Sequence, residues 1–548
     1  MPPLRPNPSV PPLAWRLPFA FALLFSATLA ACGGGGDDPA PSNSSPAPAP
    51  APAPTPAPGA PSASSTLPDL PPCAPSGIAG TADYQIGPGK LYAELNQIPW
   101  STLQPGDTVR IFHRTQPYKT KFLLAAQGTA DKPVRICGVR GANGERPIID
   151  GNGATTPDTL TAGGAYGTAA NDIHQTRSII VIKALASQPW TAYPRHIQID
   201  GLAIRGAHPS YRFTDAAGTS RAYETFGACI WLDRGHDITI ADNQISDCQM
   251  AIFSRSTDDG DFAVTKNLRV AGNRFNGNGI VDDWFEHTTY LQSVNLLLEF
   301  NRYGPMRSGA TGNQHKDRSV GSVIRYNYIE GGAHNLDLVE AEDYPATALA
   351  DPAYRRTFVY GNILKTSSAA RAAVHYGGDH FGSTPGGNWG EPLFRKGTLY
   401  FFHNTVYGTS SGNLFRISTT EETVEAWNNV FHFEGTPRLR TAENDGVGGA
   451  WISDGILNLG RNWINANWQA QGPYETLRGS ANGTANLVTG SAAPIDPNSF
   501  APLDGSVVRN AAVAGPAAAD GHRPLYQFNV SADAISARPA TTALGARE

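Results

Sequence analysis

Residues 238–245 read ITIADNQI and residues 268–275 read LRVAGNRF, and this short pattern decides the fold. In each copy a strand-like run ends in Asn, and another apolar residue follows two positions later. The pattern returns as LLLEFNRY, VIRYNYI, FVYGNIL, LYFFHNTV and VEAWNNV. Its asparagines are Asn243, Asn273, Asn301, Asn327, Asn362, Asn404 and Asn428.

The spacing of these asparagines is typical of a solenoid. The shortest interval is 24 residues, from 404 to 428, and the longest is 42 residues, from 362 to 404. Strand, tight bend and strand make one turn, which insertions lengthen. Asn suits the bend because it tolerates left-handed geometry, and in a stack it can bond to the Asn of the next turn. Helices would need longer segments and a propeller a steadier period, so we predict an all-β stack of parallel strands.

The segments that flank the repeat are similar to the terminal turns of a known superfamily. YQIGPGKLYAELNQIPWSTLQPGDTVRIF begins at Tyr84, and GTADKPVRICGV and PIIDGNG follow it. APLDGS at 501–506 and the closing Leu544-Gly545-Ala546 stand at the other end. These segments resemble pectate-lyase-like proteins, which implies a single-stranded right-handed parallel β-helix from about Tyr84 onward. The resemblance leaves the activity open, because the superfamily includes lyases, hydrolases, epimerases and non-catalytic binders.

The N-terminus has the features of an export signal. Two arginines precede an apolar stretch, residues 17–29, that is shorter than the ~20 residues a membrane span needs. Leu29-Ala30-Ala31-Cys32 resembles the lipobox of bacterial lipoproteins. We therefore expect residues 1–31 to be a signal peptide and Cys32 to be lipidated.

Residues 32–72 are rich in Gly, Pro, Ala and Ser, which predicts a disordered linker and leaves residues 73–548 as the β-helix domain. We expect an exported lipoprotein, held at the outer membrane or cell surface through its lipid alone, and a monomer. The net charge of −5 argues against nucleic acid as a partner. Four further cysteines permit two disulfides, for which we predict Cys73–Cys137 and Cys229–Cys248, with free buried thiols as the alternative.

A second repeated unit precedes the Asn strands and indicates which side chains point outward from one sheet. Its copies are CIWLDR, AIFSRS, HKDRS, NLDLVEAED, AAVHYGG and NLFRIS. With apolar residues inward at alternate positions, the outward row is Trp231, Phe253, Lys316, Asp337, His375 and Arg416. Aromatic faces stack on pyranose rings and charges hold carboxylates, so the row predicts a site for an acidic polysaccharide.

Charge is densest between residues 312 and 343, where a buried ion-pair ladder is the structural alternative to a site. We favour a polysaccharide lyase, in which a base removes the proton α to a uronate carboxylate while a cation neutralises that carboxylate. Lys316 is the first candidate base, if neighbours such as Arg318 lower its pKa, and His375 is the second. The predicted substrate contacts are Trp231, Phe253, Arg325 and Arg416, with Arg318 or Arg416 on the carboxylate.

Asp337, Glu340 and Glu342 are candidate ligands for Ca²⁺. The alginate lyase and chondroitinase B group resembles this arrangement in using a lysine, an arginine and carboxylate-bound calcium on a β-helix. In that group an acidic pair precedes the lysine, whereas Glu340 and Glu342 follow Lys316 here.

Two alternatives to a lyase stay open. One is a polygalacturonase-like hydrolase, for which Asp282-Asp283 supplies an acidic pair. The other is a non-catalytic surface lipoprotein that only binds glycan or supports adhesion. We also expect the insertions at about 206–226, 343–357 and 377–397 to rise from one side of the stack and to wall a groove.

Overall fold

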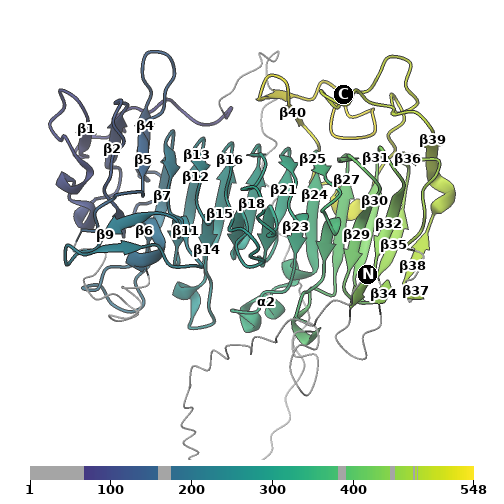
Figure 1. Cartoon of the computed structure of the whole chain (residues 1–548), viewed down its shortest axis with the longest axis horizontal. Helices are drawn as coiled ribbons and strands as arrows, with labels where there is room; N and C mark the ends of the chain where they lie inside the picture. Colours follow the sequence, from purple (N-terminus) through teal and green to yellow (C-terminus); the bar gives the residue numbers. More distant parts are fainter. Residues whose placement is uncertain are drawn as a thin grey trace, which may run out of the picture. The chain divides into compact units, whose positions relative to one another are not determined.

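The computed structural model describes residues 67–157, 174–380, 391–444, 451–453, 455–472, 476–477 and 479–548. These residues form the predicted right-handed parallel β-helix, whose coils follow one another along the long axis (Figure 1). The predicted signal peptide, Cys32 and the linker up to residue 66 lie outside the described residues. No helix in the described part of the chain is long and apolar enough to cross a membrane.

Each full coil contributes one strand to each of three parallel sheets. The thirteen-stranded sheet consists of β1 (Asp83–Ile86), β2 (Thr108–Phe112), β4 (Val134–Val139), β7 (Arg195–Asp200), β12 (His236–Ala241), β15 (Lys266–Ala271), β18 (Val294–Glu299), β21 (Val323–Arg325), β24 (Arg356–Tyr360), β27 (Thr398–Phe402), β30 (Thr423–Trp427), β35 (Ile456–Leu459) and β38 (Ser480–Asn482).

The eleven-stranded sheet consists of β5 (Ile148–Asp150), β8 (Ala203–Arg205), β13 (Gln244–Ser246), β16 (Arg274–Asn276), β19 (Arg302–Tyr303), β22 (Tyr328–Glu330), β25 (Ile363–Thr366), β28 (Thr405–Gly408), β31 (Val430–Phe433), β36 (Asn462–Asn465) and β39 (Leu487–Gly490).

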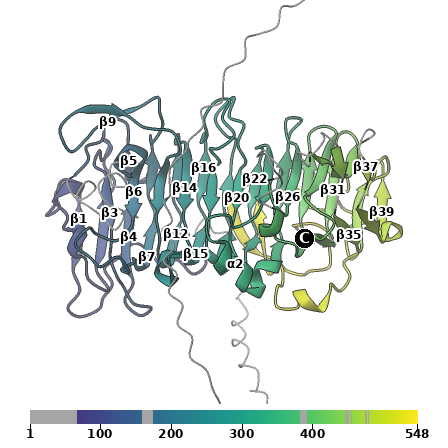
Figure 2. The same ribbon diagram turned by 90° about the horizontal axis from the view of Figure 1, so that it is seen from below.

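The ten-stranded sheet consists of β3 (Phe122–Leu124), β6 (Ser178–Ile182), β11 (Ala228–Leu232), β14 (Met250–Ser254), β17 (Thr289–Leu291), β20 (His315–Asp317), β23 (His334–Leu338), β26 (Ala372–Tyr376), β29 (Gly412–Ile417) and β32 (Pro437–Thr441). Seen from below, β14, β20 and β26 follow one another along the stack (Figure 2).

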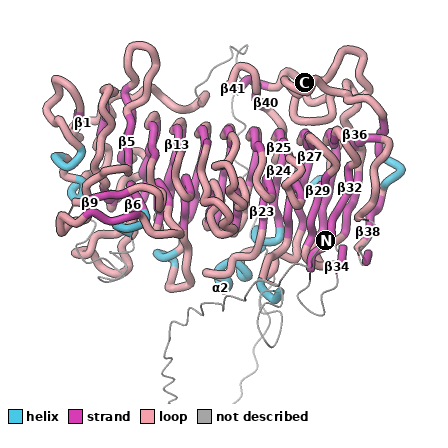
Figure 3. Tube along the Cα trace, in the orientation of Figure 1, coloured by secondary structure: helices cyan, strands magenta, loops and turns pink. Residues whose placement is uncertain are grey.

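The remaining elements are short and lie in the connections or in the segment that follows β39 (Figure 3). The strands outside the three large sheets are β9 (Arg212–Thr214), β10 (Ser220–Ala222), β33 (Glu443–Asn444), β34 (Trp451–Ser453), β37 (Thr476–Leu477), β40 (Tyr526–Asn529) and β41 (Ala534–Ala537). The helical turns are η1 (Leu95–Gln97), η2 (Trp100–Thr102), η4 (Asp261–Ala263), α2 (Pro345–Ala350), η5 (Pro352–Arg355), η6 (Glu391–Leu393), η7 (Thr484–Asn486) and η8 (Ala517–Ala519).

A ladder of asparagine side chains runs through the bend that leads from the thirteen-stranded to the eleven-stranded sheet. The side-chain oxygen of Asn273 accepts hydrogen bonds from the backbone N–H of Asn243 at 3.0 Å and from its Nδ2 at 3.2 Å. The same pair of bonds repeats from coil to coil, which confirms the predicted bonding between turns. The ladder comprises Asn243, Asn273, Asn301, Asn327, Asn362, Asn404, Asn429 and Asn462.

Two details of the predicted repeat are wrong. The ladder uses Asn429 and not Asn428, whose side chain instead donates to the carbonyl of Val513. The left-handed residue is the one before each ladder Asn from Asn243 to Asn429: φ is +62° at Phe300 and +57° at Tyr326. The ladder Asn therefore acts through its hydrogen bonds, and its neighbour adopts the uncommon backbone conformation of the bend.

The described residues reach back beyond residue 73 to Leu67. Leu67 is buried and packs in a cluster with Ala241 and Ala271, and Asp69 forms an ion pair with Arg269 at 2.7 Å. Residues 67–72, assigned to the linker from composition, therefore already dock on the stack.

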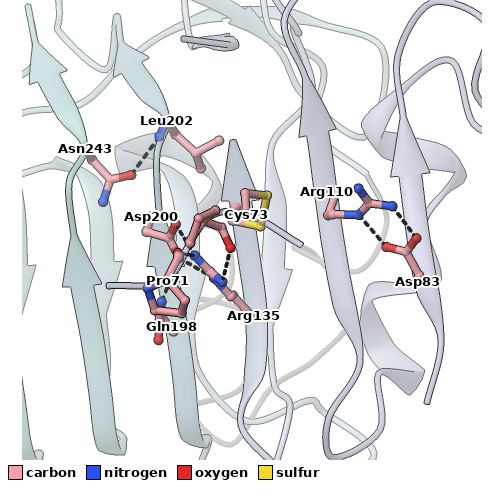
Figure 4. The surroundings of a disulfide bond; sticks show 11 residues. Pro71, Cys73, Asp83, Arg110, Arg135, Gln198, Asp200, Leu202 and Asn243 are labelled. Carbon is pink, nitrogen blue, oxygen red and sulfur yellow. Dashed lines mark hydrogen bonds and ion pairs between the residues drawn. A yellow bond between two sulfur atoms is a disulfide. The ribbon is translucent and has the colours of Figure 1, made fainter. Parts of the chain in front are cut away.

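Both predicted disulfides, Cys73–Cys137 and Cys229–Cys248, are present. The first joins the docked N-terminal segment to β4 (Figure 4). Beside it, Arg135 forms an ion pair with Asp200 at 2.8 Å and donates to the backbone carbonyl of Pro71 at 2.7 Å.

The three long insertions do not rise from one side, contrary to the prediction. Residues 206–226 lie between β8 and β11 and so precede the ten-stranded sheet within a coil. Residues 343–357 and the described parts of 377–397 follow β23 and β26 and so leave that sheet at its opposite edge. Insertions therefore flank the ten-stranded sheet on both sides, where its strands begin and where they end.

Candidate active site

The ten-stranded sheet carries the predicted outward row. The register pairs Trp231 with Phe253 on adjacent strands, and it pairs Lys316 with Asp337 and Asp337 with His375. Arg416 follows beside His375. The alignment is confirmed, with one member added: Tyr290 stands between Phe253 and Lys316.

All seven members of this row line one cavity of about 730 Å³, within the ~300–1,000 Å³ usual for small-molecule sites. The walls of the cavity come from segments that lie just before the strands of this sheet and from segments that follow them. Phe226, Trp284 and Arg371 precede their strands, whereas Arg255, Glu342 and Asp379 follow theirs. We refer to this space as the cavity.

One end of the cavity has an aromatic floor. The rings of Trp231 and Phe253 lie 4.3 Å apart, and the ring of Tyr290 meets that of Phe253 edge-on at 5.3 Å. Phe226 packs against Phe253 at 5.4 Å. Phe285 and Trp284 stand at the rim and expose 71% and 55% of their surface. Exposed aromatic rings beside a cavity are suited to the faces of sugar rings.

The middle of the cavity is a buried network of charges. Lys316 Nζ contacts two carboxylates, Asp337 at 3.2 Å and Asp379 in a shorter contact. Arg318 contacts Asp379 at 2.9 Å and Glu340 at 3.1 Å, and its Nε donates to the hydroxyl of Tyr290 at 2.8 Å. The two cations therefore share Asp379, a residue from the connection after β26.

This network sets the charge of Lys316. Burial lowers the pKa of Lys316, but the carboxylates Asp337 and Asp379 outweigh it, so that its pKa is raised above the ordinary value. Arg318 acts in the predicted direction and lowers the pKa, although more weakly than the carboxylates raise it. Lys316 is therefore a buried ammonium ion, and the condition under which it was to act as a base is not met.

Asp337 connects Lys316 to two histidines. Burial raises the pKa of Asp337, but Lys316 and His375 hold it well below the ordinary value, so the carboxylate is ionised. His375 Nδ1 lies 2.7 Å from Asp337 Oδ1 and donates to it, because an ionised carboxylate only accepts. In the neutral form of His375 this bond leaves the lone pair on Nε2, which lies 3.2 Å from Ser418 Oγ.

His334 lies beside this pair, with its ring 5.2 Å from that of His375. Its Nδ1 lies 3.0 Å from the side-chain oxygen of Asn313, and burial holds its pKa well below the ordinary value. His334 is therefore neutral. Because the amide oxygen only accepts, the proton is on Nδ1 and the lone pair is on Nε2.

The three carboxylates predicted to bind Ca²⁺ do not form one site. Asp337 belongs to the network of Lys316 and His375, whereas Glu340 and Glu342 bind Arg318 and His380. Among the described residues, two groups have ligand atoms close enough to hold a metal ion: His334 with Asp337 and His375, and Glu340 with Asp379 and His380. Both groups include histidine, whereas Ca²⁺ prefers oxygen ligands, so neither fits Ca²⁺ well.

Arg325 is the one predicted substrate contact that does not line the cavity. It lies on β21 of the thirteen-stranded sheet, where it pairs with Glu299 at 2.7 Å and donates to the hydroxyl of Tyr360. Trp231, Phe253 and Arg416 do line the cavity. Five further residues of the cavity had no periodic sequence pattern to indicate them, because they lie in a short strand or in connections: Tyr290, Asn313, Arg371, Asp379 and His380.

Buried neutral histidines make the stability of the protein sensitive to acid. Burial lowers the pKa of His315 to about 4 and that of His287 to about 3, from an ordinary value of 6.5. Between about pH 6.5 and 4 these histidines bind protons in the unfolded chain but stay neutral in the folded protein. The free energy of unfolding should therefore fall as pH drops from about 6.5 towards 4. Each histidine should contribute up to ~1.4 kcal/mol per pH unit.

His315→Gln is expected to reduce the slope of the unfolding free energy against pH by the contribution of one histidine, as measured by urea unfolding at a series of pH values. Equal slopes for the two proteins would contradict the assignment.

The fold resembles those of several solved carbohydrate-active enzymes. An alginate lyase from Paenibacillus sp. str. FPU-7 is 14% identical, with a TM-score of 0.33, over 68% of this chain and 91% of that one. A lacto-N-biosidase of family GH136 from Eubacterium ramulus is 12% identical, with a TM-score of 0.38, over 74% and 67%. Pectate lyase Pel9A is 10% identical, with a TM-score of 0.32, over 86% and 98%. At such values no activity transfers to this chain.

No family model matches the chain, and no curated protein matches it in sequence.

Proposed function

We propose that this protein binds an acidic polysaccharide in the cavity and cleaves it by β-elimination at a uronate. The observation that carries the proposal is the row itself, in which aromatic rings lead to a buried ammonium ion, an ionised aspartate hydrogen-bonded to a histidine, and an arginine on one face of one sheet. Such a face provides both a platform for sugar rings and charged groups for acid–base chemistry.

The charge of the cavity supports an anionic substrate. Among the described residues that line it, the cationic side chains are Arg177, Arg255, Lys316, Arg318, Arg371 and Arg416. The carboxylates are Asp337, Glu342, Asp343 and Asp379. The lining thus holds six cations and four carboxylates, and further carboxylates behind it pair with Arg318, Arg177 and Arg255. The cationic side chains of the lining are suited to the carboxylates of an acidic glycan.

In this proposal His375 is the base that removes the proton α to the uronate carboxylate. Asp337 fixes its tautomer through the 2.7 Å bond to Nδ1 and stabilises the imidazolium that forms. Arg416, the neighbour of His375 on the next strand, binds the substrate carboxylate. Lys316 and Arg318 stabilise the negative charge that develops there.

Tyr290 is suited to return a proton to the leaving oxygen. Burial raises the pKa of Tyr290 to about 12, so the phenol is protonated at neutral pH. Its hydroxyl accepts from Arg318 Nε at 2.8 Å, and this bond stabilises the phenolate left after proton transfer.

Hydrolysis is the second candidate, and one observation favours it. Asp337 and Asp379 both contact Lys316 Nζ, so that two carboxylates flank one point of the cavity. Glycosidases use a carboxylate pair, one as acid and one as base or nucleophile. Against this role, the pKa of each is lowered and neither is poised as the acid, because nearby cations hold both ionised despite burial.

Product analysis on a panel of uronate polymers separates these functions. Elimination creates an unsaturated uronate that absorbs in the ultraviolet, together with a new reducing end. Hydrolysis gives reducing ends without that absorbance. Binding without either product on every polymer would overturn both enzymatic proposals in favour of a glycan-binding protein.

We also propose that the chain is exported and carries a lipid at Cys32, as its N-terminal sequence suggests. Mass spectrometry of the mature N-terminus, compared between the wild type and Cys32→Ala, tests this proposal.

A further inference from the structure

Four of the five arginines that line the cavity lie towards its two ends. Arg371 immediately precedes β26 and Arg416 lies on β29, beside His375. Arg255 immediately follows β14, and Arg177 immediately precedes β6. The central coils, β20 and β23, carry the network in which Lys316 and Arg318 are balanced by carboxylates.

The two ends are several coils apart. The order of strands from Arg255 to Arg416 is β14, β17, β20, β23, β26 and β29, which is five steps. At a spacing of ~4.8 Å per step, the distance along the stack is about 24 Å. A pyranose unit advances a glycan chain by a length similar to one strand spacing, so a chain that reaches both ends has about five or six sugars.

The end near β14 has the components of a binding subsite. Trp231 and Phe253 form the aromatic floor there, and Arg255 and Arg177 lie at opposite edges of the sheet. Arg177 forms an ion pair with Glu224 at 3.7 Å, and Arg255 forms one with Asp233 at 3.9 Å. An aromatic floor flanked by two arginines is suited to an acidic sugar, because the ring can stack on the aromatic faces while the carboxylate accepts hydrogen bonds from a guanidinium.

We infer that this end is a distal subsite for an acidic sugar, about five units away from the sugar bound at Arg416, so that the protein acts on long chains and not on short oligomers. The inference rests on the proposed acidic polysaccharide substrate. The distal subsite, defined by Arg177, Trp231, Phe253 and Arg255, contributes binding energy remote from the bond that breaks.

The test compares oligouronates of three and of seven sugars, for both binding and cleavage. Binding is measured by calorimetry and needs no turnover. The wild type should bind the longer oligomer at least ~10-fold more tightly, because only the longer one spans both ends and gains charge-assisted hydrogen bonds at the distal subsite. Arg255→Gln and Arg177→Gln should remove most of this difference and leave binding of the trimer unchanged.

Arg205→Gln is the matched control, because Arg205 is a partly exposed arginine on β8 of the eleven-stranded sheet. It should leave both affinities unchanged. Equal affinity of the wild type for trimer and heptamer, or equal weakening of both by Arg255→Gln, would overturn the distal subsite even if cleavage is observed. Tight, length-dependent binding without any product would uphold the subsite and refute elimination.

Discussion

His375→Gln is expected to lower kcat on a cleaved uronate polymer by ~10²–10⁴-fold, the usual contribution of a general base. Glutamine retains a polar group beside Asp337 but cannot take up the proton. The rate is measured from the ultraviolet absorbance of the unsaturated product. KM should change little, because the carboxylate contact at Arg416 and the aromatic floor remain.

His432→Gln is the matched control for this variant. His432 is a largely buried histidine on β31 of the eleven-stranded sheet, outside the cavity. It should retain the wild-type rate. Full activity of His375→Gln would exclude His375 as the base, and an equal loss in both variants would point to a general effect on folding.

Lys316→Met is expected to lower the free energy of unfolding by ~3–5 kcal/mol, the usual cost of removing one partner from a buried ion pair. Methionine fills much the same space, so the loss arises from leaving Asp337 and Asp379 without their ammonium partner. Chemical denaturation at neutral pH measures the change. Activity should fall as well, because the same ammonium ion stabilises charge in the proposed reaction.

Lys365→Met provides the comparison for stability. Lys365 pairs with Glu330 at 2.8 Å on the eleven-stranded sheet, with its side chain 32% exposed. A solvent-exposed ion pair of this kind contributes ~0–1 kcal/mol. Similar losses in the two lysine variants would contradict the buried, doubly paired state of Lys316.

The fold and the row were predictable because both depend on periodicity. Asn243, Asn273 and Asn301 recur once per coil, and alternate positions in a strand must point to opposite faces. Tyr290 escaped the alignment because its strand, Thr289–Leu291, is short and follows an irregular connection. No sequence pattern therefore indicated that Tyr290 belongs to the row.

The electrostatics of the site were not predictable from the row. The charge of Lys316 depends on Asp379, which comes from a connection 63 positions later in the sequence. Glu340 and Glu342 follow the end of β23, and they face Arg318 and His380 and not Asp337. Side chains beyond a strand end no longer keep its alternation, so the assignment of three carboxylates to one Ca²⁺ site failed.

The cross-link at Cys73 determines how the stack responds to a pull on the preceding chain. Noncovalent contacts at Leu67 and Asp69 can give way one after another under tension. The disulfide between Cys73 and Cys137 then transmits the force to β4, which pairs in parallel with both β2 and β7. A pull from the N-terminal side is thus taken up by a covalent bond at β4, which lies before the strands β11 to β29 that carry the row.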